Sequence, residues 1–87
     1  MRKVHKIKLS REFQEQILSG DKTFEVRYND RGYQKGDYVE FYVTDRRNVV
    51  EPLDGKLFEI TYVLSGWNIE TGYVVFSMKP VEGRDGT

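Results

Sequence analysis

The chain has 87 residues, of which 38% are apolar and 14% aromatic, and its 14 lysines and arginines balance 14 aspartates and glutamates. This length suits one small domain with a core built around large rings. The absence of cysteine excludes disulfides, thiolate catalysis and cysteine-based zinc sites, and a single histidine excludes a histidine cluster. Because no apolar run suits a membrane span or a signal peptide, we expect a cytoplasmic protein with no metal, other cofactor or membrane partner.

The neutral total hides an uneven distribution of charge. Residues 1–11 carry five basic groups and no acid, whereas the remaining 76 residues carry nine basic and 14 acidic groups. One interpretation is a solvated edge strand, because lysines on an edge discourage unwanted strand pairing. The other is one wall of a groove that attracts anions. The neutral total argues against strong non-specific binding to nucleic acid.

The first predicted elements are a strand and a short helix. Apolar residues two apart predict a strand over Val4–Leu9. An amphipathic helix is predicted over Arg11–Ser19, with Ser10 as its N-cap and Gly20 ending it. Its apolar stripe is expected to comprise Phe13, Ile17 and Leu18. A helix this short must dock on a sheet to be stable.

Alternating patterns predict the remaining strands at Phe24–Tyr28, Tyr38–Val43, Leu57–Leu64 and Tyr73–Met78. In the first of these, Phe24, Val26 and Tyr28 share one face and Glu25 and Arg27 the other. Each of the other three strands is expected to carry its alternating apolar residues on one face. These residues are Val39, Phe41 and Val43; Phe58, Ile60, Tyr62 and Leu64; and Val74, Phe76 and Met78.

Polar or irregular segments separate these strands. Asn29–Asp37 reads as a loop, and Thr44–Gly55 as an irregular connection in which Val49 and Val50 form a candidate short strand. The order of elements predicts an α+β domain over residues 1–79, followed by a disordered tail at 80–87. We expect a partly closed β-barrel of about five to six strands, with one short helix covering an opening beside a cleft.

The densest polar segment is Gly20-Asp21-Lys22-Thr23-Phe24-Glu25-Val26-Arg27. Its G-x-K-x-x-E-x-R form resembles the motif of the ASCH domain family, a branch of the PUA-like barrels. Further matching segments extend the resemblance over about residues 3–79: His5-x-Ile7-Lys8-Leu9, Asn29-Asp30-Arg31, Lys35-Gly36-Asp37 and Gly72-Tyr73-Val74-Val75. The ordered set resembles a small bacterial and phage ASCH-like family of unassigned function. The resemblance implies a PUA-like barrel whose motif residues line a cleft.

The resemblance also implies binding of RNA or a nucleotide in that cleft. Lys22 and Arg27 would hold a phosphate or ribose, Arg31 would offer a second phosphate contact, and Glu25 would accept from a base amino group. The rings that could stack on a base are Tyr28, Tyr33, Trp67 and Tyr73. Each of these roles has a competing structural interpretation. Glu25 and Arg27 could form an ordinary solvated ion pair, the rings could pack in the core, and Asp30 and Arg31 could hold their own loop.

Two further functions stay open at this point. Some small ASCH-type relatives are amidohydrolases acting on acetylated cytidine. The resemblance implies that they use a Lys–Thr–Glu constellation, in which the lysine activates the threonine hydroxyl. Lys22 matches the lysine, but the position of the threonine holds Glu25, so that activity does not carry over. A different hydrolysis remains a candidate, in which Glu25 is the general base on a water and Lys22 the oxyanion partner. The third hypothesis is a protein-interaction module that uses Trp67 and Tyr33 as anchors.

Three remaining predictions concern structure. His5 shares the face of Ile7 and Leu9, and we expect it to be buried or hydrogen-bonded. Asp37, which follows Gly36, is expected to make turn hydrogen bonds. Because an exposed edge strand can pair with another copy, we expect a monomer or a weak dimer.

Overall fold

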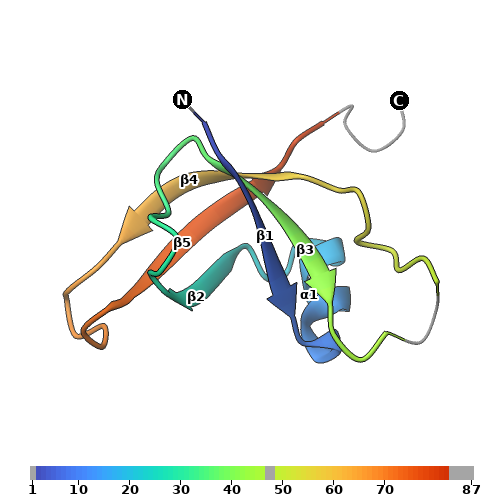
Figure 1. The fold of residues 1–87 in the computed structure, drawn as a ribbon, viewed down its shortest axis with the longest axis horizontal. Helices are drawn as coiled ribbons and strands as arrows, with labels where there is room; N and C mark the ends of the chain where they lie inside the picture. Colours follow the sequence, from blue (N-terminus) through green and yellow to red (C-terminus); the bar gives the residue numbers. More distant parts are fainter. Residues whose placement is uncertain (1, 47–48, 83–87) are drawn as a thin grey trace.

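The computed structural model describes residues 2–46 and 49–82, and this part of the chain forms one curled sheet and one short helical segment (Figure 1). The strands are β1 (Val4–Leu9), β2 (Phe24–Tyr28), β3 (Tyr38–Val43), β4 (Phe58–Leu64) and β5 (Tyr73–Pro80). The helical segment is a 3-10 turn, η1 (Arg11–Phe13), that continues into α1 (Gln14–Ser19). The predicted α+β class, the strand number and the helix are confirmed.

The topology brings the two edges of the sheet toward each other. The strand order is β1-β3-β4-β5-β2, with β1 parallel to β3 and the other pairs antiparallel. The strands β1 and β2 are consecutive in the chain, yet each is an edge, and η1 and α1 connect them. In Figure 1, α1 lies beside the carboxyl ends of β1 and β3. The sheet is therefore a half-barrel whose open side lies between β1 and β2.

The predicted alternation correctly identifies most of the core. The strands β1, β2 and β3 have the predicted bounds, β4 begins one residue later at Phe58, and β5 continues to Pro80. Beyond β5, the Val81 amide donates to the Leu57 carbonyl, and residues 83–87 of the predicted tail lie outside the described residues. The buried apolar residues of the strands are Ile7, Leu9, Val39, Phe41, Val43, Phe58, Ile60, Val74, Phe76 and Met78.

A β-bulge changes which side chains of β4 face the core. Ile60 pairs with Met78, but Tyr62 pairs with Ser77, so the register shifts between them. Beyond this shift Val63 packs against the core, while Tyr62 is 62% exposed. The prediction that Tyr62 and Leu64 share the face of Phe58 and Ile60 is therefore wrong, because a bulge inserts one residue and reverses the alternation after it.

The helix has the predicted bounds but different contacts. Ser10 makes no side-chain cap, and its carbonyl instead accepts from the Phe13 amide at 3.0 Å. Phe13 and Leu18 are exposed, whereas Gln14 and Ile17 are buried. The predicted stripe is wrong at two positions. The first turn is 3-10, which changes the angular spacing at Phe13, and Leu18 follows the buried Ile17 directly, so it points away from the buried direction. Gly20 ends α1 in the left-handed conformation, as predicted.

A buried carboxylate anchors the long connection after β3. Glu51 is 1% exposed, and its Oε1 accepts from Arg11 at 2.7 Å and from Gln14 at 3.1 Å. This network explains why polar Gln14 is buried, since a buried amide needs partners. No strand forms at Val49 and Val50, which are both exposed in the described part of this connection.

His5 and Asp37 have the structural roles predicted for them. The His5 Nε2 atom lies 2.9 Å from Oδ2 of Asp37, and both residues are buried. The amides of Lys3 and Gln34 also donate to this carboxylate. Burial alone would raise the pKa of Asp37, but these hydrogen bonds outweigh it and hold the pKa below its usual value.

Candidate functional site

The strand β2 directs its charged face inward and its apolar face outward. Glu25 is only 4% exposed and Arg27 is half-buried, whereas Phe24, Val26 and Tyr28 are all exposed. A strand normally buries its apolar residues, so this inversion is informative. It places the motif charges in the opening of the half-barrel, where a ligand can reach them.

Glu25 is bound by two cations. Lys22 Nζ contacts Oε2 of Glu25, while Nε and Nη2 of Arg27 lie 3.0 and 2.9 Å from Oε1. The side chains of Lys22 and Arg27 are 17% and 24% exposed, so the cluster is only partly open to solvent. A buried carboxylate with both oxygens paired avoids the cost of an isolated charge. Glu25 therefore positions the two cations.

Arg27 also connects the two edges of the sheet. Its Nη2 lies 2.5 Å from the main-chain carbonyl oxygen of Lys8 on β1. Within residues 2–46 and 49–82, the Nη1 atom of Arg27 makes no hydrogen bond, so it can donate to a ligand. Lys22 uses its ammonium on Glu25 and on the Phe24 carbonyl at 2.8 Å, which leaves a third donor.

Two hollows meet at Lys8 and Arg27. The first, of about 230 Å³, is also lined by Lys22 and Glu25, with hydroxyls from Ser10 and Thr44. The second hollow, of about 350 Å³, is lined on its other sides by Ile7, Tyr28, Asp30, Arg31 and Tyr33. Since Lys8 and Arg27 line both, we treat the two hollows as one cleft between β1 and β2.

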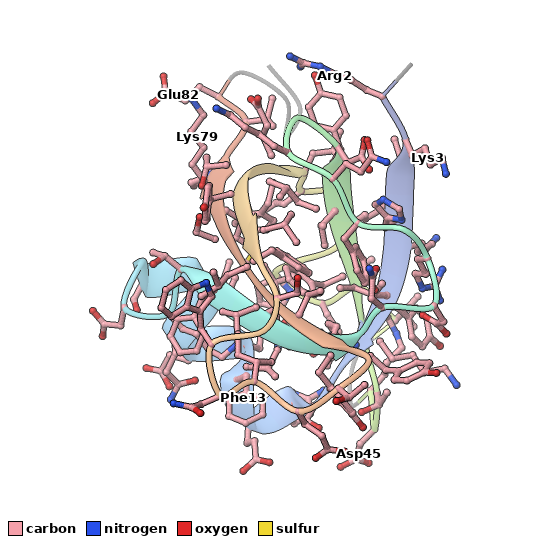
Figure 2. All side chains as sticks on the ribbon, turned by 90° about the vertical axis from the view of Figure 1, so that its left-hand side faces the viewer. Arg2, Lys3, Phe13, Asp45, Lys79 and Glu82 are labelled. Carbon is pink, nitrogen blue, oxygen red and sulfur yellow. The ribbon has the colours of Figure 1, made fainter. Side chains whose placement is uncertain are left out.

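The cleft is basic although the whole chain is neutral. Its lining includes four cationic side chains, Lys8, Lys22, Arg27 and Arg31, but only two carboxylates, Glu25 and Asp30. Lys8 comes from the basic first segment of the chain, so that segment is both an edge strand and a wall of the cleft. Figure 2 shows Arg2 and Lys3 at the opposite end of the molecule from Phe13 and Asp45. Phe13 lines the first hollow, so Arg2 and Lys3 lie at the other end of the molecule from that hollow. The basic charge of the cleft therefore comes from the side chains that line it.

The predicted stacking rings occupy different environments. Tyr28 lines the second hollow and is 58% exposed, and its ring meets the ring of Tyr73 at 5.5 Å in an edge-to-face contact. Tyr73 lines neither hollow and is the cross-strand neighbour of Tyr28. Trp67 lies in the β4–β5 loop, is 85% exposed and has a left-handed φ of 52°. The structure does not bring Trp67 into the lining of either hollow.

Tyr33 is not an exposed anchor. It is 5% exposed and its ring packs between His5 at 4.8 Å and Phe76 at 5.0 Å. Burial raises the pKa of its phenol, although Arg27 and Arg31 act in the opposite direction. The prediction of Tyr33 as an exposed interaction anchor is wrong, because the loop after β2 folds its ring against the core.

Sequence reasoning missed two hydroxyls in the cleft. The sequence predicts Ser10 only as a helix cap and Thr44 only as the start of a connection. Both reach the cleft because β1 and β3 pair in parallel, with Leu9 opposite Val43, so their next residues lie together. Thr44 Oγ1 donates to the Leu9 carbonyl at 3.2 Å. No local pattern could indicate this contact, since it depends on pairing over 35 residues.

One further hollow lies away from the cleft. A hollow of about 380 Å³ between α1 and the end of β5 is lined by Ile17, Leu18, Lys56, Leu57, Phe58, Pro80, Val81 and Glu82. It contains none of the predicted site residues and is mostly apolar. Across residues 2–46 and 49–82, no group of three histidine or acidic side chains is arranged to hold a metal ion. No helix in this part of the chain has the length and apolar character needed to cross a membrane.

The fold and the cleft define a class of protein: a small α+β half-barrel whose open side carries a Lys–Glu–Arg cluster. The chain belongs to the family described as "Domain of unknown function (DUF3850)", whose model matches residues 4–78. The match extends from the first residue of β1 into β5 and so includes every cleft residue named above. No curated protein matches the chain.

Proposed function

We propose that the protein is an ASCH-like relative of the PUA domains and that it binds RNA, or a nucleotide, in the cleft between β1 and β2. The observation that carries this proposal is the pair of cations that Glu25 holds in the first hollow, of which Arg27 also lines the second. Arginine and lysine are the side chains that most often contact phosphate, and Arg27 retains a donor for it.

The shape of the cleft favours a short strand over a free mononucleotide. Two hollows that share Lys8 and Arg27 offer cations at successive positions, with Lys22 beyond one and Arg31 beyond the other. A chain of phosphates would match this spread of charge. Tyr28, whose exposed ring lines the second hollow, is placed to stack on a base. The net charge of zero fits a small recognition site rather than a coating binder.

The role proposed for Glu25 differs from direct base recognition. Both of its oxygens already accept from Lys22 or Arg27 and its side chain is only 6% exposed, so a base amino group or a water has little access to it. The same occupancy disfavours Glu25 as a general base on water. We therefore favour binding over hydrolysis, with Glu25 as the group that positions the phosphate-binding cations.

Titration of a fluorescent single-stranded RNA of about six nucleotides tests the proposal by anisotropy at several salt concentrations. We expect saturable binding that weakens with salt, and a slope of log affinity against log salt that falls by about one in Lys8→Ala or Lys22→Ala. Lys79→Ala is the matched control, because Lys79 is exposed at the end of β5 and lines neither hollow.

Circular dichroism should show that all three variants fold. Equal affinity for native protein, Lys8→Ala and Lys22→Ala would remove the cleft from the binding site. The absence of saturable binding to any RNA or to mononucleotides would reject the proposal as a whole. Binding of a mononucleotide as tight as that of the six-mer would retain the site but reject the extended ligand.

A further inference from the structure

The inverted orientation of β2 leaves an ordered apolar surface on the outside of the sheet. Strand pairing arranges it in three rows: Phe24, Ser77 and Tyr62; Val26, Val75 and Leu64; and Tyr28 with Tyr73. We call these eight residues the outer face. Aliphatic side chains form its middle row, with aromatic rings on both sides.

The outer face is large for a chain of this size. Phe24, Val26, Tyr28, Tyr62 and Tyr73 are each between 36% and 62% exposed. Since a large aromatic side chain offers about 150–250 Å², the outer face presents on the order of 500 Å² of apolar surface. Monomeric proteins seldom expose contiguous apolar patches larger than this without using them. A standard interface buries about 800 Å² on each partner, so the face alone would support a weak complex.

The charge of the outer face narrows the kind of partner. All eight side chains are uncharged, and at the nearby end of the sheet Glu59 lies opposite Lys79, so these charges compensate each other. RNA is disfavoured here because phosphates need cations, which the cleft has and this face lacks. A strongly charged protein would gain no electrostatic attraction from it.

A second copy of this chain fits these constraints. The face is neutral, the whole chain has a net charge of zero, and two copies therefore approach without repulsion. The aromatic–aliphatic–aromatic order lets a two-fold axis bring the middle row against itself and the rings against rings. We propose that the protein forms a weak homodimer by packing outer face on outer face, as the two sheets of a β-sandwich pack.

This proposal does not rest on RNA binding. The cleft lies on the inner side of β2, where Glu25 and Arg27 point, and the outer face lies on the other side. The dimer would leave the first hollow open, since no outer-face residue lines it. Tyr28 belongs both to the outer face and to the lining of the second hollow, so the interface would border that hollow. Two half-barrels would present their cleft cations outward from a shared apolar centre.

Sedimentation velocity on the full chain, from about 1 µM to about 1 mM, tests the proposal. We expect the weight-average mass to rise from 10.3 kDa toward twice that value as concentration increases. Val26→Lys and Tyr62→Lys each place a charge in the outer face, and we expect each to weaken association at least about tenfold. Val49→Lys is the control, since Val49 is 94% exposed but lies outside the face.

Dilution of an isotope-labelled sample gives an independent readout. The amide signals of Val26, Val75 and Leu64 should shift with concentration, while those of Lys22 and Thr44 in the cleft should not. Native protein that stays monomeric at the highest concentration overturns the proposal, whatever other molecule covers the face. Dimerisation that Val26→Lys and Tyr62→Lys leave unchanged, with both variants folded by circular dichroism, overturns it as well.

Discussion

The guanidinium of Arg27 on β2 donates a hydrogen bond to the main-chain carbonyl of Lys8 on β1, with 2.5 Å between Nη2 and the oxygen. These strands are the two edges of the sheet, and η1 and α1 connect them in the chain. In a closed barrel, a ladder of main-chain hydrogen bonds would join such edges. Here a side chain makes the connection, and Glu25 orients that side chain. Closure of the half-barrel and arrangement of the site therefore depend on the same group.

Replacement of Arg27 by lysine should separate charge from geometry. An ammonium group keeps the positive charge but lacks the planar fork that reaches Glu25 and the Lys8 carbonyl together. We expect the free energy of unfolding to fall by about 1–2 kcal/mol, measured by urea denaturation. Arg31→Lys, at an exposed position in the second hollow, should change stability by less than about 0.5 kcal/mol. Equal stability of the two variants would argue against a closing role for Arg27.

Neutralising Glu25 should cost more than losing one of its partners. In Glu25→Gln the side chain keeps its shape, but Lys22 and Arg27 lose the carboxylate that holds them together in a half-buried site. Breaking a buried ion cluster by removing one member typically costs several kcal/mol, and because both cations are partly exposed we expect about 2–3 kcal/mol. Urea unfolding measures it, with Glu70→Gln at an exposed position as the control. A loss no larger than the control's would mean that the cluster contributes little to stability.

Local patterns predicted the secondary structure because most of the signal is local. The alternation in Val4–Leu9 and Tyr38–Val43 reflects one face buried in the core, and both strands have the predicted bounds. The sequence could not indicate the bulge in β4, because Tyr62 and Val63 are both apolar and either could continue the buried face after Ile60. The exposed position of Phe13 likewise depends on the 3-10 turn that begins the helical segment.

The candidate site was predictable mainly in the segment from Lys22 to Arg31, which contains β2. Lys22, Glu25 and Arg27 are close in the chain, and strand geometry puts Glu25 and Arg27 on one face. Which face points inward is a tertiary choice, and here the sheet buries the charged one. Lys8, Ser10 and Thr44 join the site through the curl of the sheet and the parallel pairing of β1 with β3, which no short pattern encodes.

Acid should destabilise the protein as two carboxylates lose their folded-state partners. Arg46 and the Glu51 amide hold the pKa of Asp54 at about 2, below the ordinary value of 3.8, and the pKa of Asp37 is also lowered. A carboxyl with a lower pKa in the folded state contributes stability above its unfolded pKa, and that contribution is lost as pH falls through the folded pKa. We expect urea midpoints to fall as pH decreases from 4 toward 2.

The variant Asp37→Asn isolates one of these groups. It should be less stable than native protein at pH 7, since the charge that accepts from His5 and from the Lys3 amide is gone. Its stability should then decline less steeply than that of the native protein as pH falls below about 4. Parallel pH profiles for the two proteins would show that Asp37 does not contribute to acid destabilisation.

Gly72 should resist substitution for two separable reasons. Its φ of 89° is left-handed, and a Cβ added there would lie 2.8 Å from Cε1 of Tyr28, the ring proposed to stack on a base. In the same loop Gly66 has a φ of 72° but no atom within 4 Å of an added Cβ. We expect Gly66→Ala to cost about 1 kcal/mol for its backbone alone, and Gly72→Ala to cost about 1 kcal/mol more because the Tyr28 ring must move.

A double-mutant cycle measured by urea unfolding separates the two terms at Gly72. With Tyr28→Ala as background the ring is absent, so the cost of Gly72→Ala should fall to that of Gly66→Ala. A cost that is the same in both backgrounds would show that the Tyr28 ring is free to move. In that case the close contact between Gly72 and Tyr28 would not hold the ring in place at the edge of the second hollow, and the ring would have to be ordered by the ligand.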